Sequence, residues 1–169
     1  LNEKRQNSCI TMQLDLHNTA GLPQLVEKSL QHWGQLDLLI NNASSFYPTT
    51  IGGMTEDNWN DLIGSNLKAP LFLSQAATPA LRKSAGSTPS IVDIHAERPM
   101  TNHTIYCSAK AGLAMMTKSL AKELGPAIRV NCVAPGAIMW PESELDNTTQ
   151  NEILDRTALK RSGCPEDIA

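Results

Sequence analysis

Tyr106 and Lys110 are the residues of this sequence whose types and spacing most directly suggest chemistry. They lie four positions apart in the run Tyr-Cys-Ser-Ala-Lys, and this spacing puts both side chains on one face of a helix. An ammonium beside a phenol favours the phenolate and lowers the pKa of the phenol from its ordinary value of about 10. A phenol tuned in this way can transfer a proton near neutral pH, although a surface aromatic–cation pair has the same spacing.

Other polar groups fall where strands are predicted to end. They follow short strand-like runs at 36–40, 91–94 and 129–133, and they are Asn41-Asn42-Ala43, Asp93 and Pro135-Gly136. Asn66 stands among apolar residues of a predicted helix, where a polar side chain needs a partner. Ligands of doubly wound sheets bind outside the carboxyl ends of the strands. We therefore expect these groups to converge on one edge of a sheet.

The elements that hold these groups are predicted from the positions of apolar residues. Strand-like runs at 10–16, 36–40, 91–94 and 129–133 alternate with helical runs at about 22–30, from 55 onward and at 105–124, and a helical patch follows at 153–159. The run at 10–16 has one polar face and suits a sheet edge, and 36–40 reads as a buried strand. Residues 84–89 are predicted to be a loop, and Pro70 to kink its helix or lie near a turn. The alternation predicts a single α/β domain over 1–169, a doubly wound parallel sheet with helices on both faces.

The combination of these motifs resembles the short-chain dehydrogenase/reductase family over essentially the whole chain. The motifs are Asn-Asn-Ala at 41–43, Asn66 within a helix, the Tyr106–Lys110 pair and Pro135-Gly136 after Arg-Val-Asn-Cys-Val-Ala. The run Asn-Asn-Ala-Ser-Ser-Phe-Tyr-Pro-Thr at 41–49, with Asp93 where the family usually has a serine, is similar to pteridine reductases of the bacterial type. The resemblance implies a Rossmann-type fold.

The resemblance also implies roles for individual residues. The catalytic set would be Tyr106 and Asp93 as sources of protons, Lys110 holding the nicotinamide ribose, and Asn66 supporting Lys110 through a water relay. The cofactor-binding set would be Asp15, Leu16, Asn42, Ala43, Ser44, Tyr106, Lys110, Pro135, Gly136 and Ile138. The substrate-binding set would be Ser44, Phe46, Asp93, Tyr106 and Trp140, within a stretch up to Pro141 that borders the substrate.

Asp93 is the residue that turns the expected substrate from a ketone to a nitrogen heterocycle. A serine hydroxyl polarises a ketone, whereas a carboxylate pairs with N–H donors and can relay a proton. The alternative is that Asp93 only caps a turn after its strand, as aspartates often do. Phe46 could likewise be loop packing, but an aromatic face favours a flat heterocycle.

The glycine-rich loop that cradles a dinucleotide pyrophosphate in this family does not occur in the 169 residues. We therefore expect the sequence to be a partial record of a Rossmann-type domain that lacks the first strands and the last strand. The basic residues that select NADP over NAD would lie in the missing part. NADPH as the cofactor is implied only by the likeness to pteridine reductases.

Composition excludes several other classes of protein. The net charge is −3, so no basic surface for nucleic acid is expected, and no apolar run approaches the roughly 20 residues that span a membrane. Four well-separated cysteines (9, 107, 132 and 164) are predicted to be reduced thiols of a cytoplasmic protein. The four histidines (17, 32, 95 and 103) show no metal-ligand spacing, so no metal site is expected.

The favoured interpretation is an NADPH-dependent reductase of a pterin or dihydrofolate, and the resemblance implies a homotetramer. Two alternatives stay open. One is a carbonyl reductase of the same family with another substrate. The other is a remnant without cofactor that serves as a binding or structural subunit. The missing glycine-rich loop supports this alternative, whereas the presence of Asn66, Tyr106 and Lys110 argues against it.

Overall fold

The computed structural model describes residues 3–138 and 146–169. In chain order the helices and strands are α1 (Leu22–Trp33), α2 (Glu56–Ile63), a π-helical turn (Gly64–Lys68), α3 (Ala69–Ser84), β1 (Ser87–Ile91), α4 (Thr104–Leu124), β2 (Arg129–Val133) and α5 (Asn147–Arg156). Single turns of 3-10 helix lie at Thr19–Gly21, Ile94–Ala96 and Pro165–Asp167. Among these residues, no helix is both long enough and apolar enough to cross a membrane.

The sheet is parallel, as the alternation of elements predicted. β1 pairs with β2 from Ser87 opposite Arg129 to Ile91 opposite Val133. Two parallel bridges, Leu38 to Ser87 and Asn41 to Ser90, add residues 37–41 beside β1. The connection from β1 through α4 to β2 is the β–α–β unit that parallel pairing requires.

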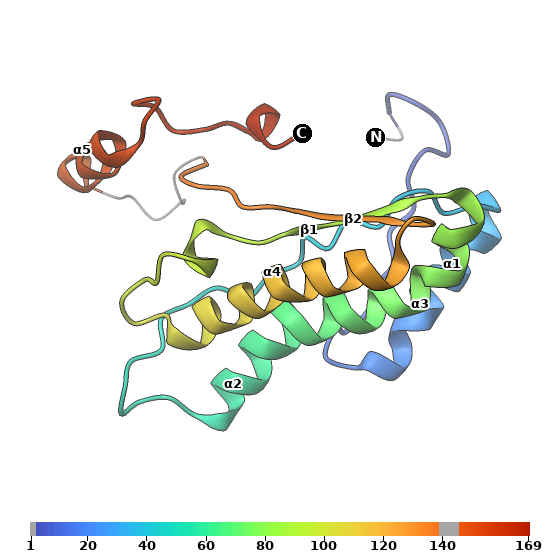
Figure 1. The fold of residues 1–169 in the computed structure, drawn as a ribbon, viewed down its shortest axis with the longest axis horizontal. Helices are drawn as coiled ribbons and strands as arrows, with labels where there is room; N and C mark the ends of the chain where they lie inside the picture. Colours follow the sequence, from blue (N-terminus) through green and yellow to red (C-terminus); the bar gives the residue numbers. More distant parts are fainter. Residues whose placement is uncertain (1–2, 139–145) are drawn as a thin grey trace.

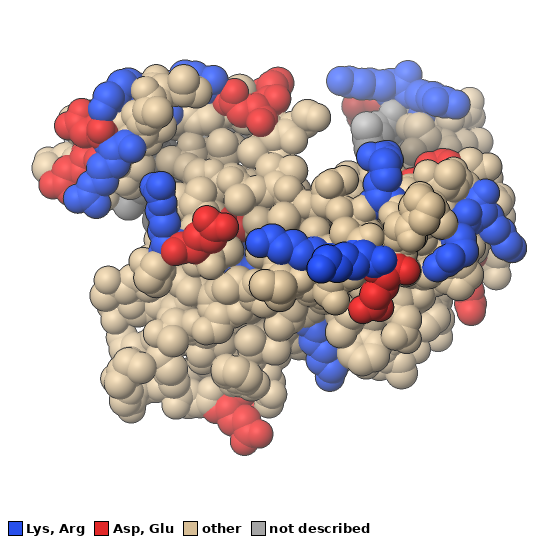
Figure 2. Space-filling view, viewed as in Figure 1, with Lys and Arg blue, Asp and Glu red and all other residues tan. Residues whose placement is uncertain are grey.

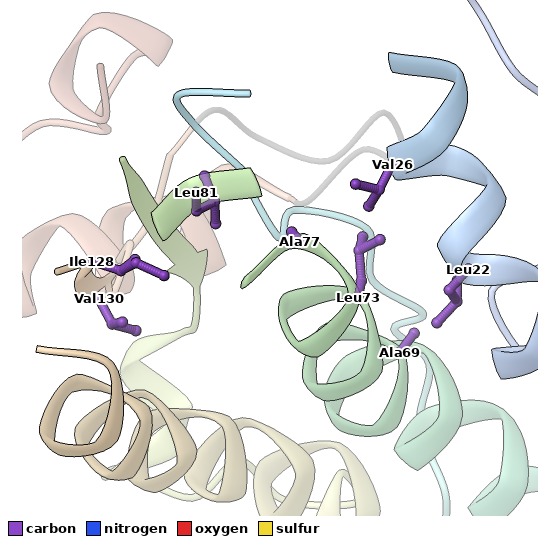
Figure 3. Close-up of a cluster of buried hydrophobic side chains, with 8 residues drawn as sticks. All are labelled: Leu22, Val26, Ala69, Leu73, Ala77, Leu81, Ile128 and Val130. Carbon is purple, nitrogen blue, oxygen red and sulfur yellow. The ribbon is translucent and has the colours of Figure 1, made fainter. Parts of the chain in front are cut away.

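Helices α1, α3 and α4 lie on one side of the sheet, and α5 lies apart from them, at the upper left of Figure 1. Figure 1 shows α3 and α4 running side by side below β1 and β2, with α1 beside α3. Three helices thus cover one face of a parallel sheet, in agreement with the α/β class that the sequence predicted. The main core lies between α1, α3 and the β2 side, and Figure 3 shows its side chains from these elements: Leu22, Val26, Ala69, Leu73, Ala77, Leu81, Ile128 and Val130.

Local signals account for the helix boundaries. α1 has Pro23 in its first turn and ends at Gly34, whose φ of 75° favours glycine. Thr55 begins α2 with a capping box, in which its hydroxyl accepts from the Asn58 N–H and the Asn58 side chain accepts from the Thr55 N–H. Pro70 lies in the first turn of α3, where the π turn before it absorbs the proline without ending the helix.

The strand predictions were less accurate than the helix predictions. Residues 10–16 form no ladder with any described residue, and 36–40 contribute bridges but no continuous buried strand. The prediction of a loop at 84–89 and a strand at 91–94 was also wrong, since β1 spans Ser87–Ile91. α5 begins earlier than the helical patch predicted at 153–159. A strand is defined by its neighbours, which the local apolar pattern does not contain.

Candidate active site

Asp93 and Tyr106 meet just beyond the carboxyl end of β1. The Tyr106 hydroxyl donates to Asp93 Oδ2 at 2.7 Å, and Asp93 Oδ1 accepts from the His95 N–H at 2.9 Å. Asp93 therefore caps the turn Ile94–Ala96 with one oxygen and holds the phenol with the other. The two interpretations of this aspartate, as a cap and as a partner in chemistry, are both compatible with its position.

The pKa of Tyr106 is raised, not lowered as the sequence led us to expect. Burial contributes most, because only 4% of Tyr106 is exposed, and the hydrogen bond to the Asp93 carboxylate contributes next. The Lys110 Nζ lies 5.6 Å from the centre of the phenol ring, and it donates to the Ile91 carbonyl at 3.0 Å rather than to the phenol oxygen. Tyr106 is thus held as a neutral phenol whose proton is hydrogen-bonded to the Asp93 carboxylate.

Lys110 is a buried ammonium that retains hydrogen-bonding capacity. Only 3% of the residue is exposed, and burial lowers the pKa of Lys110, while the nearby Asp93 charge acts in the opposite direction. An ammonium has three N–H donors, and within the described residues its hydrogen-bond acceptor is the Ile91 carbonyl. The remaining donors suit the hydroxyl groups of a sugar.

Asn66 is fully buried in the π turn and holds the segment that follows Asn41-Asn42-Ala43. Its Nδ2 donates to the carbonyls of Leu62 and Ser45, each at 2.9 Å, and its Oδ1 accepts from the Ser44 hydroxyl at 2.6 Å. π turns of this kind are frequent at functional sites. No direct hydrogen bond joins Asn66 to Lys110 in the described part of the chain, so the expected relay between them stays a prediction.

Phe46 lies beside the phenol of Tyr106. The two rings are 4.8 Å apart at their centroids and nearly perpendicular, at 73°. His103 stacks on Phe46 at 4.8 Å and 15°. A backbone bridge between Thr49 and His103 joins the two segments that carry these rings. His103 was not predicted as a site residue, although its place one helical turn before Tyr106 was a signal that could have found it.

A cavity of about 190 Å³ lies beside the carboxyl end of the strand segment at 37–41. Three of the predicted cofactor-binding residues line it, namely Leu16, Asn42 and Ala43, together with apolar side chains of α1 and α3 such as Leu25 and Leu73. Mostly apolar walls with a few polar groups, namely Asn41, Asn42 and Ser65, fit a flat aromatic ring with polar substituents. Asp15 does not line this cavity, and its carboxylate accepts from the His17 N–H at 2.9 Å.

The remaining predicted residues follow β2. The Pro135 carbonyl accepts from the Ile94 N–H at 3.2 Å, which places Pro135 beside the turn that Asp93 begins. Gly136 has open space at its Cα, whereas Ile138 forms a bridge with Gly163, away from the cavity. Trp140 and Pro141 lie outside the described residues.

Comparison with known proteins defines the class that this fold and site represent. The family model described as enoyl-(acyl carrier protein) reductase matches residues 1–169. The apo SCOR enzyme from Clostridium thermocellum superposes with a TM-score of 0.85 at 27% identity, covering 98% of this chain and 65% of that chain. A second solved structure, from Sinorhizobium meliloti 1021, is 24% identical with a TM-score of 0.88 over 94% and 65% of the two chains, and supports the fold alone. The fold is therefore of Rossmann type.

Curated relatives show the family. The 3-oxoacyl-[acyl-carrier-protein] reductase FabG of Chlamydia pneumoniae is 35% identical over 92% of this chain and 64% of its own length. The FabG of Thermotoga maritima is 38% identical over 88% and 61%. Pteridine reductase 1 of Leishmania tarentolae is 35% identical over 100% and 72%. The chain belongs to the short-chain dehydrogenase/reductase family, and it spans less than two thirds of the length of the two FabG relatives.

Proposed function

We propose that this chain carries the catalytic half of an NADPH-dependent pteridine reductase. The observation that carries the proposal is the 2.7 Å hydrogen bond between the Tyr106 phenol and the Asp93 carboxylate. A neutral phenol supported by a carboxylate can donate a proton to a ring nitrogen, and the carboxylate can pair with an adjacent N–H. A pterin presents both groups on one flat ring.

The nicotinamide cofactor of this family supplies a hydride when it is bound. For that cofactor, the cavity lined by Leu16, Asn42 and Ala43 fits the adenosine end, and the spare donors of Lys110 fit a ribose. Asn66 holds Ser44, and Ser44 would contact cofactor phosphate and substrate. Phe46 is 55% exposed beside Tyr106, so part of its ring is accessible to a flat heterocycle. Support for a pterin also comes from the similarity to pteridine reductase 1.

A second candidate, reduction of a 3-oxoacyl thioester, is favoured by the FabG relatives at 35% and 38% identity. The experiment is to assay the whole protein with NADPH on dihydrobiopterin, dihydrofolate and a 3-oxoacyl thioester. We expect turnover of a pterin and little of the thioester. Turnover of the thioester alone would overturn the pterin assignment, and failure to bind NADPH would favour the remnant without cofactor.

Asp93→Ser tests whether the hydrogen bond between Tyr106 and Asp93 serves the reaction. Because serine cannot pair with a protonated ring nitrogen as a carboxylate does, we expect pterin turnover to fall about 10²-fold, while NADPH affinity changes little. Asp57→Ser, at an exposed position of α2, is the matched control. Equal losses of NADPH affinity and pterin turnover in Asp93→Ser would make Asp93 structural.

We also propose that copies of the chain assemble through the surface formed by α2, α3 and α4. Exposed apolar side chains occur on α2, α3 and α4: Trp59, Leu71, Phe72 and Met115. Figure 2 shows that basic side chains gather over the second half of α4, whereas the region over α2 and the first half of α4 carries few charges. A homotetramer would bury such a surface. Light scattering should give four chains per particle, and Met115→Glu should lower that number.

A further inference from the structure

Asp61, in α2, connects two segments that the proposed reaction uses. Its Oδ1 lies 3.1 Å from His17 Nε2 and accepts a hydrogen bond from the Ser45 hydroxyl at 3.2 Å. Burial, followed by a hydrogen bond with Asp61, raises the pKa of the neighbouring Tyr47 phenol. One carboxylate therefore contacts two separate segments of the chain: His17 lies 44 positions before it, and Ser45 and Tyr47 lie 16 and 14 positions before it.

The segment at 44–47 is fixed from both sides of Ser45. The Ser45 hydroxyl donates to Asp61, and the Ser45 carbonyl accepts from Asn66 Nδ2 at 2.9 Å. Asp61, near the end of α2, and Asn66, inside the π turn at Gly64–Lys68, thus both contact this segment. The neighbours of Ser45 are Ser44, bound to Asn66, and Phe46, packed beside Tyr106. Movement of Ser45 would therefore displace both.

His17 reaches Asp61 because Gly64 leaves room for it. A Cβ at position 64 would collide with the His17 ring, so only glycine lets the imidazole lie across the junction of α2 and the π turn. His17 directly follows Leu16, which lines the cavity assigned to the adenosine end. The contacts of Asp61 thus join the wall of that cavity to the segment that carries Ser44 and Phe46.

We propose that Asp61 is a positioning residue that fixes the segment at 44–47, so that Phe46 stays beside Tyr106 and the substrate-facing segment is tied to the cofactor cavity through His17. The identity of the substrate rests on the proposed function, but the anchoring of the segment does not. Asp61 is not expected to touch substrate or cofactor. Its effect is on how well the substrate is held.

Asp61→Ala in the whole protein tests the proposal by two readouts. Hydrogen exchange without substrate should become faster at 44–47 and stay unchanged in α4. The KM of whichever substrate is reduced should rise roughly tenfold, the worth of one hydrogen bond to a charged group, while kcat changes by less than about threefold, because Tyr106 and Asp93 are untouched. Asp57→Asn, which removes an exposed charge from the same helix, is the control and should change neither readout.

Two further variants keep the test decisive. Asp61→Asn retains an oxygen that can accept from Ser45, so it should recover part of the lost affinity. Ser45→Ala removes the same hydrogen bond without altering α2, and it decides the matter if Asp61→Ala does not fold. Unchanged exchange at 44–47 in Ser45→Ala and in Asp61→Ala would overturn the proposal. Because exchange is measured without substrate, faster exchange with no pterin turnover would count against the pterin assignment and not against the role of Asp61.

Discussion

Tyr106 and Lys110 lie in α4 and are almost wholly buried, whereas Leu38 and Ile40, on the strand segment at 37–41, expose 48% and 54% of their surfaces. Both regions are rich in apolar residues, but they differ in where their backbone hydrogen-bonding groups find partners. A helix satisfies its backbone within its own segment, and a strand depends on neighbours on both edges. The segment at 37–41 has β1 on one edge and no ladder partner on the other among the described residues. Tyr106 and Lys110 are therefore held by a helix, whereas the proposed cofactor side is bounded by a strand segment with open surfaces.

The largest expected effect comes from the catalytic side of this comparison. Tyr106→Phe removes the proton donor while keeping the ring that packs against Phe46, so kcat should fall about 10²- to 10⁴-fold. NADPH affinity should stay nearly constant, as measured by fluorescence titration. Tyr47→Phe removes the other phenol and should leave kcat within a few fold. A mild effect of Tyr106→Phe on kcat would show that Tyr106 is not the proton donor.

Core truncation compares the two regions in stability. Leu81 is fully buried between α3 and β2, so Leu81→Ala should lower the free energy of unfolding by about 2–5 kcal/mol. Leu38→Ala should lower it by less than about 1 kcal/mol, because half of that side chain is already exposed. Urea denaturation measures both. A loss at Leu38 as large as the loss at Leu81 would show that the open side is covered in solution.

The pKa of the Tyr106 phenol should depend on its partner Asp93. Asp93→Asn removes the charged acceptor, so the pKa of Tyr106 should fall, although burial keeps it above the ordinary value of about 10. Since the folded pKa is raised, the stabilisation from this phenol is full below about pH 10 and is lost as the pH rises through the folded pKa. The Cζ shifts of ¹³C-labelled tyrosine report the titration. In the matched variant Asp61→Asn, the pKa of Tyr47 should fall instead.

The smallest effects concern local caps. Thr55→Ala removes the capping box of α2 and should lower the free energy of unfolding by about 1 kcal/mol. Asp15→Ala, in the segment without ladder partners, removes one exposed hydrogen bond to the His17 N–H and should matter less, within about 0.5 kcal/mol. Thermal unfolding followed by circular dichroism measures the pair. A reversed order would mean that the segment around Asp15 is more firmly held than α2.

The same contrast explains which parts of the fold could be predicted. α4 begins within one residue of its predicted start and ends at the predicted Leu124, because its apolar periodicity and the following Gly125-Pro126 are local signals. The strand predicted at 91–94 was placed too late, because the first residues of β1, including Ser87, Thr88 and Ser90, are buried polar residues around a proline, with no apolar alternation. Asn41 gives two of them a partner, since its Nδ2 donates to the hydroxyls of Ser90 at 3.4 Å and Thr88 at 3.5 Å, and it also donates to the Ser74 hydroxyl of α3 at 3.2 Å. Such a network joins segments far apart in sequence.

The residues of the candidate site were likewise predictable only in part. Motif spacing was sufficient to single out Tyr106, Lys110, Asn66 and Asp93. The predicted direction of the Tyr106 pKa was wrong because helical spacing shows that Lys110 is near, but not that burial and the Asp93 carboxylate raise the pKa. His103 and Asp61 were missed because their partners, Phe46 and Ser45, lie 57 and 16 residues away.

The π turn at Gly64–Lys68 makes the length of this helical stretch as important as its composition. Deleting one residue there would restore ordinary α-helical winding and rotate everything beyond it by about 100° relative to α2. Asn66 would leave Ser44 and Ser45, or Leu73 would leave the core, since one rotation cannot preserve both faces. A substitution within the turn changes the contacts of one side chain. A change of length would disconnect the core from the catalytic residues in a single step, so the spacing between Asp61 and Leu73 is itself a functional constraint.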